Sequence, residues 1–398
     1  MTTTIKTFGM ALMTAGLAAC GTLSTPAPTA TYAGHLYAMT NAAGGNAIVH
    51  YGRGADGRLS LLASTPTGGS GVGGKIVTMD KEGVDPLFSN DSVVLTPDHT
   101  RLFAANAGSG SVSSFQVNAD GSLTLIGSYD AGGDFPTSLA AFGSLLYVSH
   151  AKANAAGAQL SGFRIAPDGS LSPISGAAYA PSGTTIGTQT LFSPDGKLLE
   201  FSELMTGKVT LFPVRPDGTL GAPVVNASAG AGPFGAAFLG NGKLLVSEVQ
   251  PGKMNAGSVS SYTVAGGGAL TPISSAVGNG QNATCWLTLT PDGKYLYASN
   301  TSSGDVSLYG VAEGGSLTLL TGNAAYRAPE GTVDVGGHPS SGPVDAVVSA
   351  DGLFFYQQFS GLGVVAAYRI EADGGLTPIA GGDGANLPHL GSEGLAGY

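Results

Sequence analysis

The chain has 398 residues, of which 65 are glycine and only 11% are charged, while 42% are hydrophobic. This hydrophobic share is enough for a packed core and excludes a disordered chain. The formal net charge is −10, and the 16 Lys and Arg residues form no basic cluster, which argues against a nucleic-acid partner. Many glycines, few charges and regular alternating runs predict an all-β protein with tight turns.

The first 19 residues have the pattern of a signal peptide. Lys6 precedes an apolar stretch, Phe8–Ala19, that is too short to span a bilayer. It runs into the sequence Leu-Ala-Ala-Cys-Gly at 17–21, which resembles the lipobox of bacterial lipoproteins. The resemblance implies cleavage before Cys20 and lipidation of Cys20. An ordinary cleaved signal with a chance cysteine is the alternative.

Residues 20–33 are rich in Thr, Pro and Ala and predict a flexible tether. The lipoprotein resemblance implies a periplasm-facing protein of the bacterial cell envelope. Gly21 after the cysteine, in place of Asp, favours the outer over the inner membrane. We therefore expect the protein to touch the membrane only through its N-terminal lipid.

The rest of the chain repeats one pattern. A first turn, containing Pro-Asp or Asp-Gly, joins two alternating strands at 96–98, 193–197, 290–294 and 350–352. A second turn, usually Asp-Gly, precedes another strand, and such turns supply the backbone angles that two-strand hairpins need. Counting the second turn gives seven copies, centred near residues 56–57, 120–121, 168–169, 217–218, 267–268, 314–315 and 373–374.

One four-stranded unit cannot bury both of its faces, but radially packed neighbours can. The repeats therefore predict a seven-bladed β-propeller of four-stranded antiparallel blades over residues 34–398. The first copy begins at His35 without an inner strand, and Ser392–Tyr398 has an inner-strand pattern without a blade after it. We predict that this C-terminal strand completes blade 1 and closes the ring, which removes its open edges.

Four stretches carry a resemblance to a known family: Thr-Pro-Asp-Gly at 290–293, Tyr-Leu-Tyr-Ala-Ser-Asn at 295–300, Ser-Gly-Asp-Val-Ser-Leu-Tyr at 303–309 and Gly-Ser-Leu-Thr at 315–318. Together with the terminal Gly-Leu-Ala run at 394–396, they resemble the seven-bladed lactonase family of 6-phosphogluconolactonase and carboxymuconate cyclase. The resemblance covers essentially the whole chain after the tether. It implies a propeller fold and a carboxylic ester hydrolase acting on a lactone.

Polar residues recur where each second strand of a blade ends, and these ends should face one mouth of the central channel. The aligned positions are Asn41, Asn106, His150, Glu203, Glu248, Asn300 and Gln358. The starts of the inner strands add Gln189, Trp286 and Asp345. Convergent polar groups at a concave mouth predict a binding site. We take Asn106, Asn300, Gln189, Trp286 and Asp345 as candidate ligand-binding residues.

Lactone hydrolysis needs a base to activate water and a donor or cation to stabilise the oxyanion. Glu248, Glu203 and His150 are the candidate catalytic groups. If the two carboxylates approach each other, the pKa of one should rise. The resemblance also places a Glu at position 248.

The resemblance implies cationic groups that this chain lacks. Relatives carry His or Arg at four sites that correspond here to Gln189, Phe234, Thr301 and Val344. A phosphorylated substrate would need such cations. On the mouth-facing loops, only Lys75 and Arg327 could replace them, so the sequence argues against 6-phosphogluconolactonase activity. Two long connections, at about 65–90 and 321–342, should lie over the mouth as a lid.

Three functions stay open. The first is hydrolysis of a neutral or carboxylated lactone without a cofactor. The second is a non-catalytic periplasmic scaffold, expected to be a monomer, that binds a small ligand, glycan or protein at the mouth. The third is a lactonase that uses a divalent cation held by oxygen ligands, for which the candidates are Glu203, Glu248, Asn300 and Asp345. Cys285, in an apolar run without a partner, is expected to be a buried structural thiol.

Overall fold

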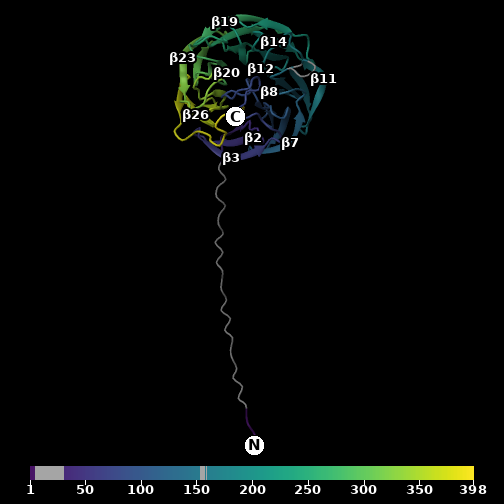
Figure 1. Ribbon diagram of the computed structural model, residues 1–398, viewed down its shortest axis with the longest axis vertical. Helices are drawn as coiled ribbons and strands as arrows, with labels where there is room; N and C mark the ends of the chain where they lie inside the picture. Colours follow the sequence, from purple (N-terminus) through teal and green to yellow (C-terminus); the bar gives the residue numbers. More distant parts are fainter. Residues whose placement is uncertain (5–30, 153–156, 158) are drawn as a thin grey trace. The chain divides into compact units, whose positions relative to one another are not determined.

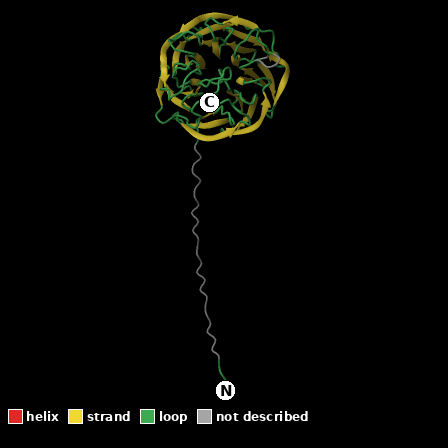
Figure 2. Cartoon of the chain, in the orientation of Figure 1, coloured by secondary structure: helices red, strands yellow, loops and turns green. Residues whose placement is uncertain are grey.

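The computed structural model describes residues 1–4, 31–152, 157 and 159–398. Cys20 and its lipobox, with most of the predicted signal peptide and tether, lie outside the described residues. Residues Tyr32–Tyr398 form one compact unit, in which the described residues are strands, turns and loops without a helix (Figures 1 and 2). The described part of the chain accordingly has no helical segment with the length and hydrophobicity of a membrane span.

Seven four-stranded antiparallel sheets form a ring, as predicted. The strands are β1 (Gly34–Met39), β2 (Ala47–Arg53), β3 (Leu59–Pro66), β4 (Val93–Leu95), β5 (Arg101–Asn106), β6 (Ser111–Val117), β7 (Leu123–Asp130), β8 (Pro136–Phe142), β9 (Leu145–His150), β10 (Leu160–Ile165), β11 (Leu171–Tyr179), β12 (Gly187–Phe192), β13 (Leu198–Glu203), β14 (Lys208–Pro213), β15 (Val224–Ala227), β16 (Pro233–Phe238), β17 (Leu244–Glu248), β18 (Ser258–Val264), β19 (Leu270–Gly278), β20 (Thr284–Leu289), β21 (Tyr295–Asn300), β22 (Asp305–Val311), β23 (Leu317–Tyr326), β24 (Pro343–Val348), β25 (Phe354–Phe359), β26 (Val364–Ile370), β27 (Leu376–Pro378) and β28 (Leu395–Gly397).

Blade 1 contains β28, β1, β2 and β3, and blades 2 to 7 take β4 to β27 four at a time. Figure 1 shows first strands such as β8, β12 and β20 near the centre and fourth strands such as β7, β11, β19 and β23 at the rim. The C-terminal strand β28 pairs antiparallel with β1, with Tyr37 opposite Ala396. The predicted closure of the ring by the C-terminus is therefore confirmed.

The first turn of a blade is held by its aspartate. Asp195 accepts hydrogen bonds from the hydroxyl of Ser193 and from the amide of Lys197, at 2.8 and 3.2 Å. The residue after this aspartate must adopt a positive φ, which is 68° at Gly196. In blade 2 the same position is His99, with a φ of 55°, so the turn tolerates a non-glycine residue.

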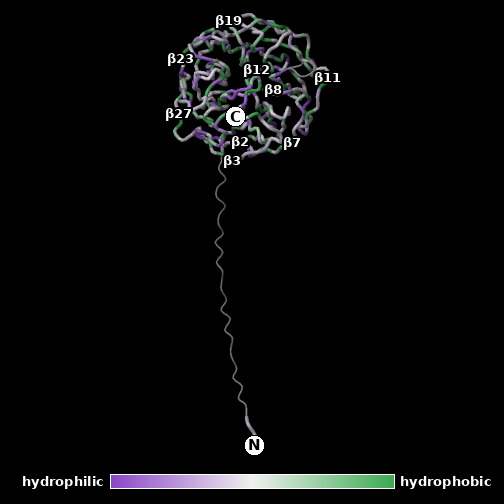
Figure 3. Tube along the Cα trace, viewed as in Figure 1, coloured by the Kyte–Doolittle hydropathy of each residue, from purple (hydrophilic) through white to green (hydrophobic). Residues whose placement is uncertain are grey.

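The hydrophobic core is divided among the seams between blades. Seven clusters of buried side chains each join two neighbouring blades. At the seam of blades 7 and 1, for example, Leu36 and Tyr51 pack with Phe354 and Tyr356. An eighth cluster among the described residues draws on several blades and belongs to no seam. Figure 3 shows hydrophilic segments near the middle of the ring, so the axis is not a simple continuation of this core.

Tyrosines on second strands tie blades together across four of the seams. Each donates its hydroxyl to a glycine carbonyl in the second turn of the next blade. The pairs are Tyr37 with Gly121, Tyr147 with Gly218, Tyr297 with Gly374 and Tyr356 with Gly57. Because the last pair joins blade 7 to blade 1, the closing seam is built like the others.

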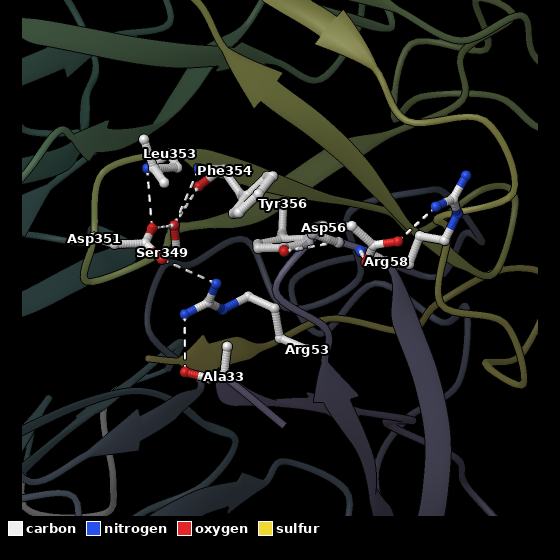
Figure 4. Close-up of polar contacts among 10 residues, drawn as sticks. Ala33, Arg53, Asp56, Arg58, Ser349, Asp351, Leu353, Phe354 and Tyr356 are labelled. Carbon is white, nitrogen blue, oxygen red and sulfur yellow. Dashed lines mark hydrogen bonds and ion pairs between the residues drawn. The ribbon is translucent and has the colours of Figure 1, made fainter. Parts of the chain in front are cut away.

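The closing seam also carries an arginine, drawn in Figure 4. Nη1 of Arg53 lies 3.1 Å from Oδ2 of Asp351, and Nη2 donates to the carbonyl of Ala33 at 3.0 Å. The guanidinium also lies over the ring of Phe354, 5.7 Å from its centroid. Arg53 is buried, so this charge depends on its partners in the seam.

Candidate mouth site

The seven polar residues at second-strand ends are all fully buried. Two asparagines show how they are used. Nδ2 of Asn106 donates to the hydroxyl of Ser113, and Nδ2 of Asn300 donates to that of Ser307, each at 2.8 Å. Oδ1 of Asn106 accepts from Asn46 in the β1–β2 connection and from Thr67 in the β3–β4 connection, and Oδ1 of Asn300 accepts from Asn279 in the β19–β20 connection and from Thr284 at the start of β20. These asparagines thus hold the third strand of a blade to the preceding loop.

The two predicted catalytic glutamates have similar local partners. Oε1 of Glu203 accepts from Thr210 at 2.8 Å, and Oε2 of Glu248 accepts from Ser258 at 2.7 Å. Each donor lies on the third strand of the blade that carries its glutamate. Burial raises the pKa of Glu248, without a contribution from Glu203. Within the described residues, no hydrogen bond and no shared partner joins the two carboxylates.

His150, the third predicted catalytic group, is also held within its blade. Its Nε2 lies 3.2 Å from Oγ of Ser161 on β10. Burial lowers its pKa to about 4, so the imidazole is neutral at pH 7. Among the described residues, no hydrogen bond links His150 to Glu203 or Glu248.

Two predicted ligand-binding residues, Gln189 and Asp345, are connected through Asp91. Nε2 of Gln189 donates to Oδ2 of Asp91 at 2.5 Å, and Oδ1 of Asp345 accepts from the amide of Asp91 at 3.2 Å. Oδ2 of Asp345 accepts from the amide of Gly394 at 2.9 Å. The inner strands of blades 4 and 7 are thereby connected to the C-terminal segment.

Five carboxyl groups in this region carry raised pKa values; Asp345, Glu200 and Glu393 are buried, and Asp85 and Asp91 are half-buried. Burial raises the pKa of Asp91 to about 6, of Asp345 to about 8 and of Glu200 to about 8. It raises that of Asp85 to about 7, and it raises that of Glu393, to which the charge of Asp85 adds. No ion pair in the described part of the chain involves any of the five. They therefore hold their protons more tightly than exposed carboxyls do.

The oxygen ligands considered for a divalent cation have hydrogen-bond partners of their own. Glu203 and Glu248 have separate partners, and Oδ1 of Asn300 accepts from Asn279 and Thr284. The described residues contain no group of three or more His, Cys, Asp or Glu side chains arranged to hold a metal ion.

A cavity of about 430 Å³ opens at the mouth over blades 4 to 6. The connections β3–β4 (residues 67–92) and β23–β24 (residues 327–342) both line it, and the amide of Val84 donates to the carbonyl of Val333 at 3.1 Å. Figure 1 shows the first of these connections, in dark blue, crossing the middle of the ring. We call this space the mouth cavity. Its volume is in the range of small-molecule sites.

Part of the eighth buried cluster forms a wall of the mouth cavity. The cluster contains Leu204, Phe234, Cys285, Trp286 and Val344, of which the first three line the cavity. The rings of Phe234 and Trp286 lie 5.4 Å apart between centroids. Nε1 of Trp286 has no hydrogen-bond partner among the described residues. Phe234, Val344 and the cavity-lining Thr301 occupy three of the positions at which the resemblance implied cations.

The cations that the sequence allowed near the mouth are engaged elsewhere. Nη2 of Arg327 donates to both carboxylate oxygens of Asp383, at 3.2 Å to Oδ1 and 3.0 Å to Oδ2. Lys75 pairs with Asp80 at 3.1 Å and lines a neighbouring cavity. Lys253 is the ammonium group among the residues that line the mouth cavity.

An aspartate–histidine pair on the β23–β24 connection also lines the mouth cavity. Nδ1 of His338 lies 3.2 Å from Oδ2 of Asp334, and the backbone amide of His338 donates to Oδ1 at 2.7 Å. Asp85, also in the lining, follows Val84, the residue whose amide is bonded to Val333 beside Asp334. The cavity thus combines an apolar wall with an aspartate–histidine pair and the carboxyl group of Asp85.

Sequence reasoning missed this pair because it looked for site residues at strand ends. His338 and Asp334 lie in a long connection outside the repeat, so no neighbouring blade shows an equivalent position. The signal available was their spacing of four residues within a connection already expected to cover the mouth.

Comparison with known proteins agrees with the fold and the repeat. Residues 81–250 and 244–386 match the family described as "Lactonase, 7-bladed beta-propeller". The chain belongs to this family. No curated protein matches the sequence.

Solved structures resemble the propeller at low sequence identity. A protein of Bacteroides fragilis NCTC 9343 described as a putative 6-phosphogluconolactonase is 19% identical, with a TM-score of 0.68 over 94% of this chain and 100% of that one. A second such protein, from Bacteroides uniformis ATCC 8492, is 19% identical with a TM-score of 0.67 over 92% and 99%. The periplasmic gluconolactonase of Pseudomonas aeruginosa is 19% identical with a TM-score of 0.66 over 92% and 98%. At these identities the likeness shows the fold alone.

Proposed function

We propose that this propeller hydrolyses a lactone in the mouth cavity, with His338 as general base and Asp334 as the residue that positions it. The observation that carries the proposal is the contact between Nδ1 of His338 and Oδ2 of Asp334 inside the lining of the cavity. Membership of the lactonase family supports the reaction class. Three structural neighbours are named for lactone hydrolysis as well.

The contact with Asp334 selects one tautomer of the neutral imidazole. With the Asp334 carboxylate as acceptor, Nδ1 of His338 is the donor, and Nε2 of the neutral ring keeps its lone pair. In the proposed reaction, Nε2 takes a proton from water as the water oxygen attacks the lactone carbonyl. The ring C–O bond then breaks, and the imidazolium returns the proton to the leaving alkoxide. The products are the hydroxy acid and the neutral base.

The test compares two histidines that each lie beside a carboxylate. We expect His338→Gln to lower kcat for lactone hydrolysis by about 10² to 10⁴, the usual contribution of general-base catalysis. His389→Gln is the matched control, because His389 lies 3.6 Å from Glu330 but does not line the cavity. Equal activity of the His338 variant and the control would reject the assignment. No turnover of any lactone by the intact protein would reject the function.

We also propose that the enzyme works at the cell envelope, held by a lipid on Cys20 and facing the periplasm at the outer membrane. The Leu-Ala-Ala-Cys-Gly sequence and the lone lysine before the apolar stretch support this proposal. Labelled palmitate should enter the intact protein but not a Cys20→Ser variant. Equal labelling of both would overturn it.

A further inference from the structure

We propose that the mouth cavity selects uncharged lactones that carry a hydrophobic substituent, and that it excludes phosphorylated ones. This inference rests on the proposed site but concerns the ligand rather than the chemical step. Three features of the cavity carry it: the apolar wall, the charges in the lining and the methionines at the entrance.

The wall would remove a hydrophobic group from water. Leu204, Phe234 and Cys285 line the cavity and belong to the eighth buried cluster, and Ile186 and Val249 pack against that cluster. Each methylene group buried against such a wall contributes about 0.8 kcal/mol, which corresponds to about fourfold in affinity.

The lining offers an anionic ligand little positive charge. Lys253 is the single Lys or Arg side chain among the lining residues, and it is exposed. Recognition of a phosphate normally uses several cations or charge-assisted hydrogen bonds, and Arg327 is already paired with Asp383. A phosphorylated sugar would therefore meet an apolar surface with too few cations to replace its hydration.

The entrance carries adaptable apolar side chains. Seven methionines occur in the chain, four of them after Tyr32, and Met79, Met205 and Met254 among these four line the cavity. Met205 and Met254 are 65% and 63% exposed. Exposed methionines cost free energy in water unless a ligand covers them, and their flexible thioethers fit varied hydrocarbon shapes.

The binding test uses Trp286, the only tryptophan of the chain, which packs behind Phe234. Its fluorescence would be followed as δ-lactams with methyl, pentyl or heptyl substituents are added to the intact protein. Lactams resist hydrolysis, so binding is measured apart from turnover. We expect Kd to fall by about fourfold per methylene until the cavity is filled, and we expect no binding of 6-phosphogluconate at millimolar concentration. Lactam affinity that does not depend on chain length, or binding of 6-phosphogluconate that is tighter than binding of the lactams, would overturn the inference.

Variants at the entrance locate the substituent. Met205→Lys combined with Met254→Lys should weaken binding of the heptyl lactam at least tenfold and leave the methyl lactam within twofold. Leu353→Lys is the matched control, because Leu353 is 53% exposed in the turn between β24 and β25 and does not line the cavity. Unchanged heptyl binding in the double variant, or an equal loss in the control, would overturn the proposal. Chain-length-dependent binding without hydrolysis of the matching lactones would instead reject the proposed function and keep this inference.

Discussion

The seams between blades and the mouth of the propeller are built in opposite ways. Every seam has its own hydrophobic cluster, and four seams repeat the same tyrosine-to-glycine hydrogen bond. The mouth cavity lacks such a repeated contact, since two long connections line it and equivalent strand-start positions of its cluster carry different residues, namely Phe234, Cys285 and Val344. The seams therefore explain why the chain folds as a ring, and the mouth carries what distinguishes this chain from other propellers.

The largest expected effect comes from opening the ring. Truncation after Gly391 removes β28, its pairing with β1 and the hydrogen bond from Gly394 to Asp345. It also exposes part of the cluster of blades 7 and 1. We expect a loss of at least about 5 kcal/mol in the free energy of unfolding, which is as large as the whole stability of many domains.

Thermal unfolding followed by circular dichroism would measure this loss. Tyr398→Ala keeps β28 and serves as the control, with an expected cost well below that of the truncation. A truncated chain that unfolds within about 2 °C of the full chain would show that the seam does not depend on the C-terminal strand.

The second prediction concerns the axial carboxyls, which connect the seams to the mouth. An unfolded carboxyl titrates near pH 4, whereas burial raises the pKa of Asp91 to about 6 and of Asp345 and Glu200 to about 8. Between these values the folded state binds more protons than the unfolded state, so stability falls as the pH rises. We expect the free energy of unfolding to drop by several kcal/mol from pH 5 to pH 8.

Urea unfolding at a series of pH values would measure this slope. Asp345→Asn removes one titrating group and should make the slope shallower. Stability that stays constant or rises over the same interval would contradict the raised pKa values.

The sequence made the repeated part of the molecule predictable, and the reason is physical. The second turns and alternating strands occur in every blade, and the strand pattern of Ser392–Tyr398 could pair only with the incomplete first blade. The mouth was harder, because a strand-end alignment gives the position of Glu203 or Glu248 but not what their side chains contact. Their serine and threonine partners lie on the adjacent strand. The contact of Asp334 with His338 depends on a connection whose path no repeat defines.

A pair of arginines, both drawn in Figure 4, gives the third prediction. Arg53 is buried in the closing seam beside Asp351, whereas Arg58 and Asp56 form an ion pair that is half exposed on both sides. We expect Arg53→Met to cost about 2–3 kcal/mol, because it removes the charged partner of Oδ2 of Asp351 and the donor to the Ala33 carbonyl. Arg58→Met should cost less than about 0.5 kcal/mol, as exposed pairs usually do. Equal effects in urea unfolding would mean that the seam gains nothing from its buried charge.

The smallest expected effect on activity separates the strand-end ring from the mouth cavity. Both oxygens of Glu248 already accept hydrogen bonds, from Ser258 at 2.7 Å and from the amide of Gly230 at 3.3 Å. Glu248→Gln replaces one accepting oxygen with an amide NH₂ that faces another hydrogen-bond donor, so we expect it to lower stability by about 1–2 kcal/mol. If His338 is the base, the same variant should keep kcat for lactone hydrolysis within about threefold of the intact protein at a temperature where both are folded. A loss of 10² or more in kcat with unfolding unchanged would return the catalytic role to Glu248, because a residue that only holds its blade together would change stability first.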